Sequence, residues 1–494
     1  MEQKRIINVS NRLPVKLCRV ADELILQQSE GGLATGLSSV FNNYCSQWIG
    51  WPGAVVVPEH QNSTTMELNE RNLTPVYLSE EEIANFYEGF SNDTLWPLFH
   101  YFPSYSNYNE QYWRSYVAVN KKFADAVVNV ARPGDMVWVH DYQLMLVPSM
   151  VRAMAPDITI GYFQHIPFPD YEIFRALPWK AELLKGLLGA DIIGFQTKAD
   201  VRHFLSTVRT VLSMTPNGNK ELVMGGRKIV IEAFPISIDH KKFHDLAKEK
   251  ATDEHVQKVK AMGDTKIMLS IDRLDYSKGI LQRLQAYELF LKKHPEWRQK
   301  VTLVHLIVPS RDNVPNYKKL KEEMNRQISQ INGTYSVFGW QPIQHFYQSF
   351  EPHMLAALYK IADVAIVTPL RDGMNLVSKE YVACNVDQNG VLLLSEAAGA
   401  AAELTDAILL NPNDTKDFAN KIYEGLTMPA KEKKERMQRM QQVVAEADIF
   451  QWAERFNERM TETDNEKKRP QQTSISFKQK DNTVVFPNNI PLAS

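Results

Sequence analysis

The strongest constraint on the fold is a regular alternation of short apolar, β-branched runs with longer amphipathic stretches. In the first half of the chain the clearest runs are 5–9, 136–140, 158–163 and 190–195. The alternation restarts after residue 263, and the runs there are 266–271, 301–308, 362–368, 391–395 and 407–410. Strands that alternate with amphipathic helices predict a parallel sheet covered by helices. The restart predicts an α/β protein with a second parallel sheet.

The chain length agrees with two folding units, because 494 residues exceed what one hydrophobic core usually organises. We expect a first domain over residues 1–235 and a second over 236–448, with a helix at 449–462 that crosses back onto the first domain. From residue 463 the sequence turns polar and loses its periodicity. Residues 463–494 are therefore predicted to form a disordered tail.

Charge and cysteine content exclude several classes of protein. Lys plus Arg number 56 and Asp plus Glu 58, so the net charge of −2 provides no general attraction for nucleic acid or a membrane surface. The three cysteines are widely spaced and form no CxxC pair, which is typical of a reducing compartment. No apolar stretch approaches about 20 residues, the length of a membrane span. We expect a soluble, unprocessed, cytoplasmic protein.

Polar and charged residues repeatedly follow the predicted strands. Parallel α/β sheets bind their ligands outside the carboxyl ends of the strands. The residues in such positions are Arg12, Asp141, His165, Arg273, Asp275, Lys278, Arg311 and Asp372. Their placement on both sheets predicts a ligand-binding cleft between the two domains.

Each of these residues also has an ordinary structural interpretation. A single arginine such as Arg12 or Arg311 is most often solvated in a loop. His165 has the alternative of a hydrogen bond to a buried carbonyl, and Asp141 that of capping the following helix. The joint placement favours ligand binding for the group, while the individual roles stay open.

The second half contains two segments suited to phosphate groups. Arg273 and Lys278 lie in DRLDYSKG before a helix, so two cations and a helix N-terminus can converge on a diphosphate. In RDGMNLVSKEY, Gly373 permits a tight turn with free amides, and Glu380 lies two turns further, where a carboxylate suits ribose hydroxyls. A charged turn and an exposed ion pair are the alternatives. No GxxxxGK[ST] or GxGxxG follows a strand, which disfavours P-loop and dinucleotide sites.

Nine motifs, in order along the chain, resemble the trehalose-6-phosphate synthases throughout residues 5–460. They are SNRLPV, EGGLATGL, WIGWPG, GFSNDTLWPLFHY, WVHDYQLMLVP, HIPFP, RLDYSKG, RDGMNLVSKEYVA and LSEAAGAAAEL. The resemblance implies a GT-B architecture of two Rossmann-like domains facing a deep cleft, with the acceptor on the first domain and the nucleotide sugar on the second. It also implies a retaining transfer of glucose from UDP-glucose, a co-substrate, to glucose 6-phosphate, with no metal and no cofactor.

The resemblance also assigns residues by motif. On the donor side it implies that Arg273 and Lys278 hold the diphosphate, and that Asp372 and His165 hold the transferred glucose. The other donor positions that it implies are Gly32, Met374, Asn375, Leu376 and Glu380. The acceptor positions that it implies are Arg12, Tyr87, Trp96 and Arg311 for the 6-phosphate, with Asp141 orienting the acceptor sugar beside Trp51.

One departure and three alternatives remain at this stage. Many relatives read SRGDV where this chain reads SRDNV at 310–314, which keeps the arginine but changes its loop. The first alternative is a catalytically silent regulatory protein, and the second is the synthase half of a longer bifunctional synthase and phosphatase, although no DxDx[TV] motif follows residue 460. A glycogen-type glucosyltransferase is the third and does not explain the Arg12, Trp96 and Arg311 set. We expect small-molecule substrates as partners and leave a homo-oligomer open.

Overall fold

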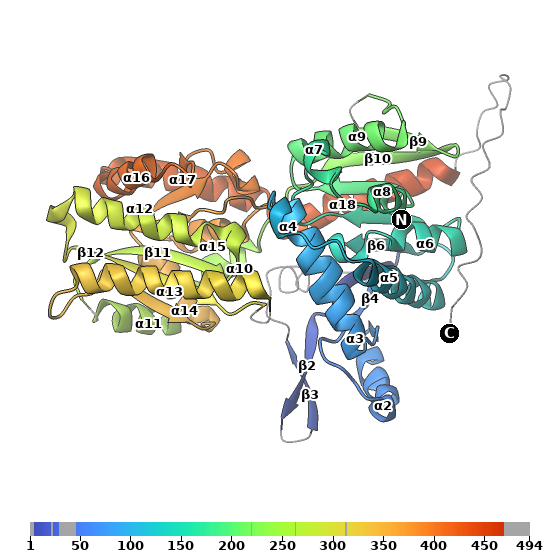
Figure 1. Cartoon of the computed structure of the whole chain (residues 1–494), viewed down its shortest axis with the longest axis horizontal. Helices are drawn as coiled ribbons and strands as arrows, with labels where there is room; N and C mark the ends of the chain where they lie inside the picture. The colour runs from blue at the N-terminus through green and yellow to red at the C-terminus, as the bar shows by residue number, and fades with distance from the viewer. Residues whose placement is uncertain are drawn as a thin grey trace.

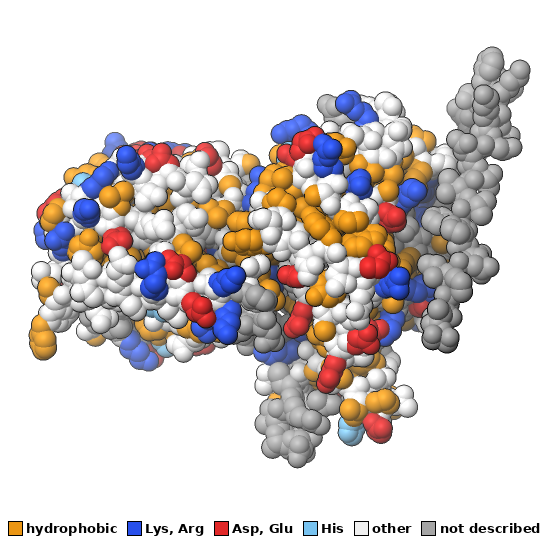
Figure 2. Space-filling view, viewed as in Figure 1, with side chains coloured by type: hydrophobic (Ala, Val, Ile, Leu, Met, Phe, Trp, Pro, Cys, Tyr) orange, Lys and Arg blue, Asp and Glu red, His pale blue; other side chains and the backbone are white. Residues whose placement is uncertain are grey.

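The computed structural model describes residues 4–20, 23–28, 46–218, 220–261, 263–311 and 314–468. These residues form two lobes, each built on a sheet with helices against it (Figure 1). The predicted α/β class with two parallel sheets is confirmed. Positive and negative side chains are interspersed over the face seen in Figure 2, as the near-zero net charge implies.

The first lobe contains an eight-stranded sheet in the order β5-β4-β1-β6-β7-β8-β10-β9. All neighbouring strands are parallel except the pair of β10 and β9. The strands are β1 (Ile6–Arg12), β4 (Ser46–Trp51), β5 (Leu73–Pro75), β6 (Met136–His140), β7 (Thr159–Phe163), β8 (Ile192–Phe195), β9 (Glu221–Met224) and β10 (Arg227–Ala233). The central strands β6, β7 and β8 are buried along their whole length, which explains why they read as continuous apolar runs.

Helices of the first lobe enclose an aromatic core beside this sheet. They are α2 (Pro58–Asn69), α3 (Glu80–Glu82), the π-helix η1 (Ile83–Leu95), α4 (Trp96–Phe99), η2 (Pro103–Tyr105), α5 (Glu110–Val130), η3 (Tyr142–Leu144), α6 (Val147–Met154), α7 (Tyr171–Phe174), α8 (Lys180–Leu187) and α9 (Lys198–Leu212). Phe86, Phe90 and Phe99 are fully buried, so the aromatic-rich segment 85–105 supplies much of this core packing. A separate hairpin of β2 (Val15–Val20) and β3 (Glu23–Gln28) extends away from both sheets (Figure 1).

The second lobe contains a six-stranded, all-parallel sheet in the order β13-β12-β11-β14-β15-β16. Its strands are β11 (Lys266–Arg273), β12 (Val301–Val308), β13 (Ile343–Tyr347), β14 (Val364–Val367), β15 (Val391–Ser395) and β16 (Ile408–Leu410). Its helices are α10 (His240–Leu246), α11 (Lys250–Lys260), η4 (Tyr276–Lys278), α12 (Ile280–Lys293), η5 (Pro295–Trp297), α13 (Pro315–Tyr335), α14 (Pro352–Ile361), α15 (Leu376–Cys384), η6 (Gly399–Ala402), α16 (Thr415–Thr427) and α17 (Ala430–Glu446). None of the helices in the described ranges is long and apolar enough to cross a membrane.

The chain passes between the lobes twice. It leaves the first lobe after β10, and it returns as α18 (Ile449–Lys468), which packs against β7 and β8. The two crossings are joined, because the Ile449 amide donates to the Ile238 carbonyl at 3.0 Å. On the first lobe Phe456 of α18 stacks on Trp138 with ring centroids 4.4 Å apart. A side chain at Gly161 would clash with Phe456, since its Cβ would lie 2.7 Å from that ring.

The start of the predicted tail is wrong by several residues. Helix α18 continues to Lys468, whereas the sequence placed the end of order before residue 463. Asp464 accepts a hydrogen bond from the Thr159 hydroxyl at 2.8 Å and forms an ion pair with Lys4. Polar residues in this last turn therefore have partners on the first lobe, which the loss of apolar periodicity does not reveal. Residues 469–494 lie outside the described residues.

Candidate functional site

A guanidinium lies between two aromatic rings at the end of β1. The Cζ atom of Arg12 is 3.9 Å from the ring centroid of Trp51 and 5.2 Å from that of Tyr87. Its Nη1 donates to the Gly53 carbonyl at 3.2 Å. Trp51 ends the neighbouring strand β4 and Tyr87 lies on η1, so three elements of the first lobe hold one positive charge in place.

Two arginines of the second lobe lie over a tryptophan of the first. The Cζ atoms of Arg273 and Arg311 are 4.5 and 4.2 Å from the ring centroid of Trp96, which begins α4. Burial would raise the pKa of the Tyr87 hydroxyl, but Arg12, Arg311 and Arg273 together hold it below its usual value. Three guanidiniums from both lobes therefore act on Tyr87, and this concentration of positive charge suits an anionic ligand.

One buried carboxylate positions the two arginines of the second lobe. Asp275 Oδ2 lies 3.4 Å from Arg273 Nε and 3.8 Å from Arg311 Nη1. Burial would raise the pKa of Asp275, but these two guanidiniums hold it far below its usual range, so the group is ionised. Arg311 also donates to the Tyr317 hydroxyl. One negative charge against Arg12, Arg273 and Arg311 leaves an excess of positive charge.

A lysine and an aspartate form the second part of the site. Lys278 Nζ, at the end of η4, lies 2.5 Å from Oδ2 of Asp372, which follows β14. The same oxygen accepts from Asn375 Nδ2 at 3.1 Å. Burial would raise the pKa of Asp372, but Lys278 lowers it, so the pair is ionic. The loop continues through Met374 into α15.

The N-terminus of α15 faces this ion pair. Asn375 has a left-handed backbone with φ 82° and caps the helix by accepting from the Ser378 amide at 3.2 Å. The first amides of a helix lack intrahelical acceptors and carry partial positive charge. Met374, Asn375 and Leu376 therefore lie where an anion between the lobes would meet them. Glu380, further along α15, accepts from the Tyr359 hydroxyl at 2.8 Å, and burial raises its pKa.

Asp141 and His165 lie at the carboxyl ends of β6 and β7 on the facing lobe. Asp141 has φ 75°, and its Oδ1 accepts from the His165 amide at 3.1 Å. His165 Nε2 lies 3.1 Å from Nδ1 of His140, and burial lowers the pKa of both imidazoles. Both rings are therefore neutral near neutral pH, with one donating to the other.

Burial raises the pKa of Asp141 to about 7, against a usual value of 3.8. Between about pH 4 and about pH 7 the folded chain thus holds a proton that the unfolded chain has released, so this group lowers the free energy of unfolding as pH rises. We expect Asp141→Asn, which does not titrate, to gain stability relative to the parent across that interval by up to about 4 kcal/mol and to level off above it. Urea unfolding at several pH values measures this, and a pH-independent difference would contradict it.

The two lobes touch at Gly373. A Cβ atom there would lie 2.4 Å from the His165 carbonyl oxygen, so an added methyl group must separate Asp372 from His165. We expect Gly373→Ala to lower the rate of the glucosyl transfer that the sequence predicts by about a hundredfold. Misplacement of reacting groups by about 1 Å has effects of this size. Gly333→Ala on α13 is the matched control, because nothing lies within 4 Å of its Cβ. Equal turnover of both variants would show that this contact is not needed.

The structure brings the candidate residues together in two adjoining groups. The first group contains Arg12, Trp51, Tyr87, Trp96, Arg273 and Arg311, and the second contains Lys278, Asp372, Met374, Asn375 and Leu376, with Asp141 and His165 on the facing lobe. Glu380 is placed further along α15, against Tyr359. Gly32 lies outside the described residues.

Sequence reasoning missed two supporting residues, His100 and Arg283, and it gave Asp275 a place after a strand but no role. His100 is fully buried, stacks on Trp96 with ring centroids 4.0 Å apart, and has a pKa lowered to about 4 by burial. Asp275 lies between the two cations of RLDYSKG, a spacing that could have indicated its role as their shared partner. Arg283 is completely buried, pairs with Asp272 at 2.8 Å and donates to the Lys278 carbonyl at 3.1 Å. It thereby fixes the loop that carries Lys278, but one arginine in an amphipathic helix gives no such signal.

A cavity of about 340 Å³ adjoins Asp372 and is lined by residues of both lobes, among them Pro167, Thr197, Arg371 and Gly399. A larger cavity of about 680 Å³ lies on the first lobe and α18. None of the candidate site residues lines it. We place the candidate site between the lobes beside the smaller cavity, because Asp372 lines that cavity and is paired with Lys278.

Comparisons with known proteins identify the family of the chain. The family model described as glycosyltransferase family 20 matches residues 4–462. A bifunctional trehalose-6-phosphate synthase/phosphatase of Thermoproteus tenax is 43% identical over 466 residues, which cover 92% of this chain and 63% of that protein, so the chain spans less than two thirds of its length. A UDP-forming alpha,alpha-trehalose-phosphate synthase of Candida albicans is 41% identical and covers 92% of this chain and 97% of its own.

A solved structure has the same fold as this chain. The crystal structure of a UDP-forming alpha,alpha-trehalose-phosphate synthase from Burkholderia xenovorans in complex with glucose-6-phosphate has a TM-score of 0.84 to this chain. Its sequence is 33% identical, and the match covers 92% of this chain and 100% of that one.

Proposed function

The chain belongs to glycosyltransferase family 20 and has the GT-B fold, and on that premise we propose that it is a UDP-forming alpha,alpha-trehalose-phosphate synthase. It transfers glucose from UDP-glucose, a co-substrate, to glucose 6-phosphate with retention of the α-linkage. The products are trehalose 6-phosphate and UDP. The names of the relatives support this reaction, and the charges of the site support its two phosphorylated substrates.

One observation carries the proposal: guanidiniums from both lobes gather at Trp96 and Tyr87. A sugar phosphate is a dianion, and charge-assisted hydrogen bonds from arginine are among the strongest that a partly buried site can make. Arg12 and Arg311 bind the 6-phosphate in this proposal, and the aromatic rings keep their guanidiniums in place. Asp141 orients the acceptor sugar beside Trp51.

The donor occupies the second group of residues. Arg273 and Lys278 hold the diphosphate together with the N-terminal amides of α15 at Met374, Asn375 and Leu376. Glu380 accepts from the ribose hydroxyls, and Asp372 and His165 bind the hydroxyls of the transferred glucose. Lys278 then exchanges its bond to Asp372 for a phosphate oxygen, which frees the carboxylate for the sugar.

Turnover with a panel of nucleotide glucoses tests the proposal. We expect UDP-glucose with glucose 6-phosphate to give stoichiometric UDP and a nonreducing disaccharide phosphate, and glucose without phosphate to be a poor acceptor. Absence of transfer from every nucleotide glucose, with ligand binding intact, would favour a silent regulatory protein. Transfer to a glucan without glucose 6-phosphate would favour a glycogen-type enzyme.

Retention can proceed through a carboxylate nucleophile, as in retaining glycosidases. Here the nearby carboxylates have other assignments, since Asp372 binds glucose hydroxyls, Glu380 the ribose and Asp141 the acceptor. We therefore favour a front-face reaction, in which the bond from the anomeric carbon to the diphosphate breaks and the acceptor hydroxyl attacks from the same side. The departing phosphate oxygen takes the acceptor proton, while Arg273 and Lys278 hold that oxygen in place.

Trapping with a fluorinated donor distinguishes the two mechanisms. We expect the intact mass of the protein to stay unchanged during turnover of a 2-fluoro donor, because no covalent glucosyl enzyme forms. A kinetically competent adduct on Asp141, Asp372 or another carboxylate, located by peptide mass analysis, would establish double displacement instead.

A further inference from the structure

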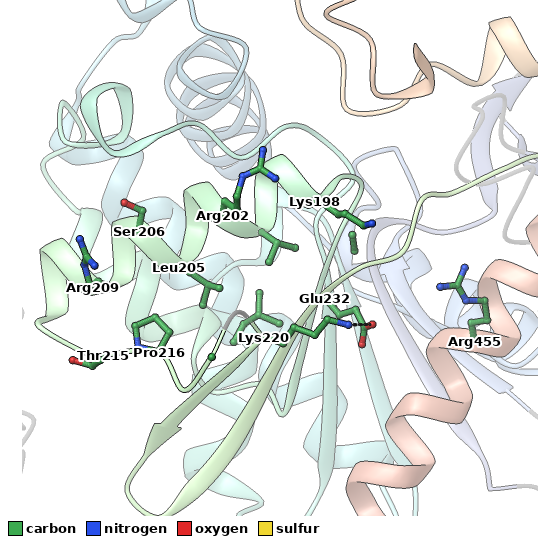
Figure 3. Close-up of a pocket in the computed structure, with 14 residues that line it drawn as sticks. Lys198, Arg202, Leu205, Ser206, Arg209, Thr215, Pro216, Lys220, Glu232 and Arg455 are labelled. Carbon is green, nitrogen blue, oxygen red and sulfur yellow. Dashed lines mark hydrogen bonds and ion pairs between the residues drawn. The ribbon is translucent and has the colours of Figure 1, made fainter. Parts of the chain in front are cut away.

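A second cavity, larger than the one beside Asp372, lies away from the proposed active site. It has a volume of about 680 Å³ and lies between α9, the β9–β10 hairpin and α18. Its floor is apolar and includes Val201, Leu205 and Ile231, while basic side chains surround it (Figure 3). The volume falls in the range of small-molecule sites, which is about 300–1,000 Å³.

Three of the cations come from one face of α9. Lys198, Arg202 and Arg209 all line the cavity, and their spacing of four and seven residues brings them to the same side of the helix together with Leu205. Arg455 adds a charge from α18. In Figure 3 Arg209 and Arg455 lie at opposite ends of the cavity, with Lys220 between them.

Among the residues that the structure describes, these charges are not balanced by acidic side chains. Within the described ranges no ion pair joins Lys198, Arg202, Arg209 or Arg455 to another residue. The cavity's one carboxylate, Glu232, is already paired with Lys220 at 2.9 Å and approached by Arg459 at 3.6 Å.

Other surface helices of this chain balance some of their cations within the same helix. Ion pairs three or four residues apart balance Lys121 with Asp125, Arg326 with Glu323, and Arg436 with Glu432. Like charges four residues apart destabilise a helix. Helix α9 carries the pair Lys198 and Arg202 without such compensation. A ligand that brings negative charge would supply it.

The dimensions select the kind of anion. Along a helix with a rise of about 1.5 Å per residue, Arg202 and Arg209 are about 10 Å apart and Lys198 and Arg209 about 16 Å. A single phosphate group cannot meet all of them, whereas several linked phosphates can. The apolar floor additionally offers contact to an uncharged organic part. We propose that this cavity binds an organic polyphosphate of nucleotide size, at a site separate from the one between the lobes.

ATP is a suitable probe for this site. Binding to the full chain is measured by calorimetry in the presence of saturating UDP and glucose 6-phosphate, which keep the site between the lobes occupied. We expect binding of one ATP that weakens as salt is added, since the cations are exposed. Tripolyphosphate should bind more weakly than ATP, because it lacks a part that contacts the apolar floor. This readout does not depend on turnover, so it stands or fails independently of the proposed reaction.

Charge reversal on α9 locates the binding. We expect R202E/R209E to weaken ATP binding by about tenfold or more, and R202Q/R209Q to weaken it less. K258E/K434E, which reverses two exposed cations on α11 and α17, is the matched control and should bind as the parent does. Melting temperatures establish that the variants are folded. No binding of ATP under these conditions, equal loss in the control, or tripolyphosphate binding as tightly as ATP would each overturn the proposal.

Discussion

Replacement of Lys278 by alanine is expected to lower the rate of glucosyl transfer by about a hundredfold to a thousandfold, the usual effect of removing one preorganised group that stabilises developing charge. Negative charge builds up on the departing diphosphate. Lys278 Nζ lies 2.5 Å from Oδ2 of Asp372, and a phosphate oxygen would take the place of that carboxylate. Arg273→Ala should have a similar effect. The measurement is single-turnover transfer at saturating donor.

Lys278→Ala also leaves the Asp372 carboxylate without its cation, so a loss of stability must be separated from a loss of catalysis. Lys266→Ala is the matched control, because Lys266 also forms a Lys–Asp ion pair, with Asp363 at 2.6 Å. Lys266 begins β11, at the end of that strand away from the site. We expect that variant to keep its turnover. In our proposal Arg273 and Lys278 stabilise the diphosphate charge without a metal ion. A chelator should therefore leave the rate of transfer unchanged. Normal turnover of Lys278→Ala would remove it from the reaction.

Replacement of Arg311 by alanine is expected to raise the KM for glucose 6-phosphate by about tenfold to a hundredfold, as loss of a hydrogen bond to a charged group implies. The kcat at saturating acceptor should fall less, and the preference for glucose 6-phosphate over glucose should fall with the KM effect. Arg12→Ala should behave in the same way. Initial rates with both acceptors measure these changes.

Arg298→Ala is the control for this prediction. The Cζ atom of Arg298 also lies over an aromatic ring, 5.0 Å from that of Tyr335, but it lies between η5 and β12 at the opposite end of the second sheet. Its removal should leave acceptor kinetics unchanged. If Arg311→Ala and Arg12→Ala both kept the parent's acceptor KM, the phosphate would have to bind elsewhere.

The sheets could be predicted from sequence because buried parallel strands are continuous apolar runs, as in β6, β7 and β12. The candidate residues could be grouped because they follow such strands. The hydrogen-bond and ion-pair partners of these residues could not be predicted from sequence. Whether Lys278 is free or paired with Asp372 depends on contacts 94 residues apart, and the convergence of Arg12 with Arg311 depends on how the lobes meet. The prediction of where α18 ends was wrong for the same reason. Asp464 is held in place by Lys4 and Thr159, which are distant in the sequence.

The two covalent passages between the lobes, bonded to each other from Ile449 to Ile238, have a mechanical consequence. A single connecting segment would let the lobes twist as well as bend relative to each other. Two connections tied side by side resist torsion and leave rotation about one axis as the soft motion. We therefore expect one angular coordinate to describe both the admission of substrates and the escape of UDP, so that a residue that stiffens this pair of tethers would slow both together.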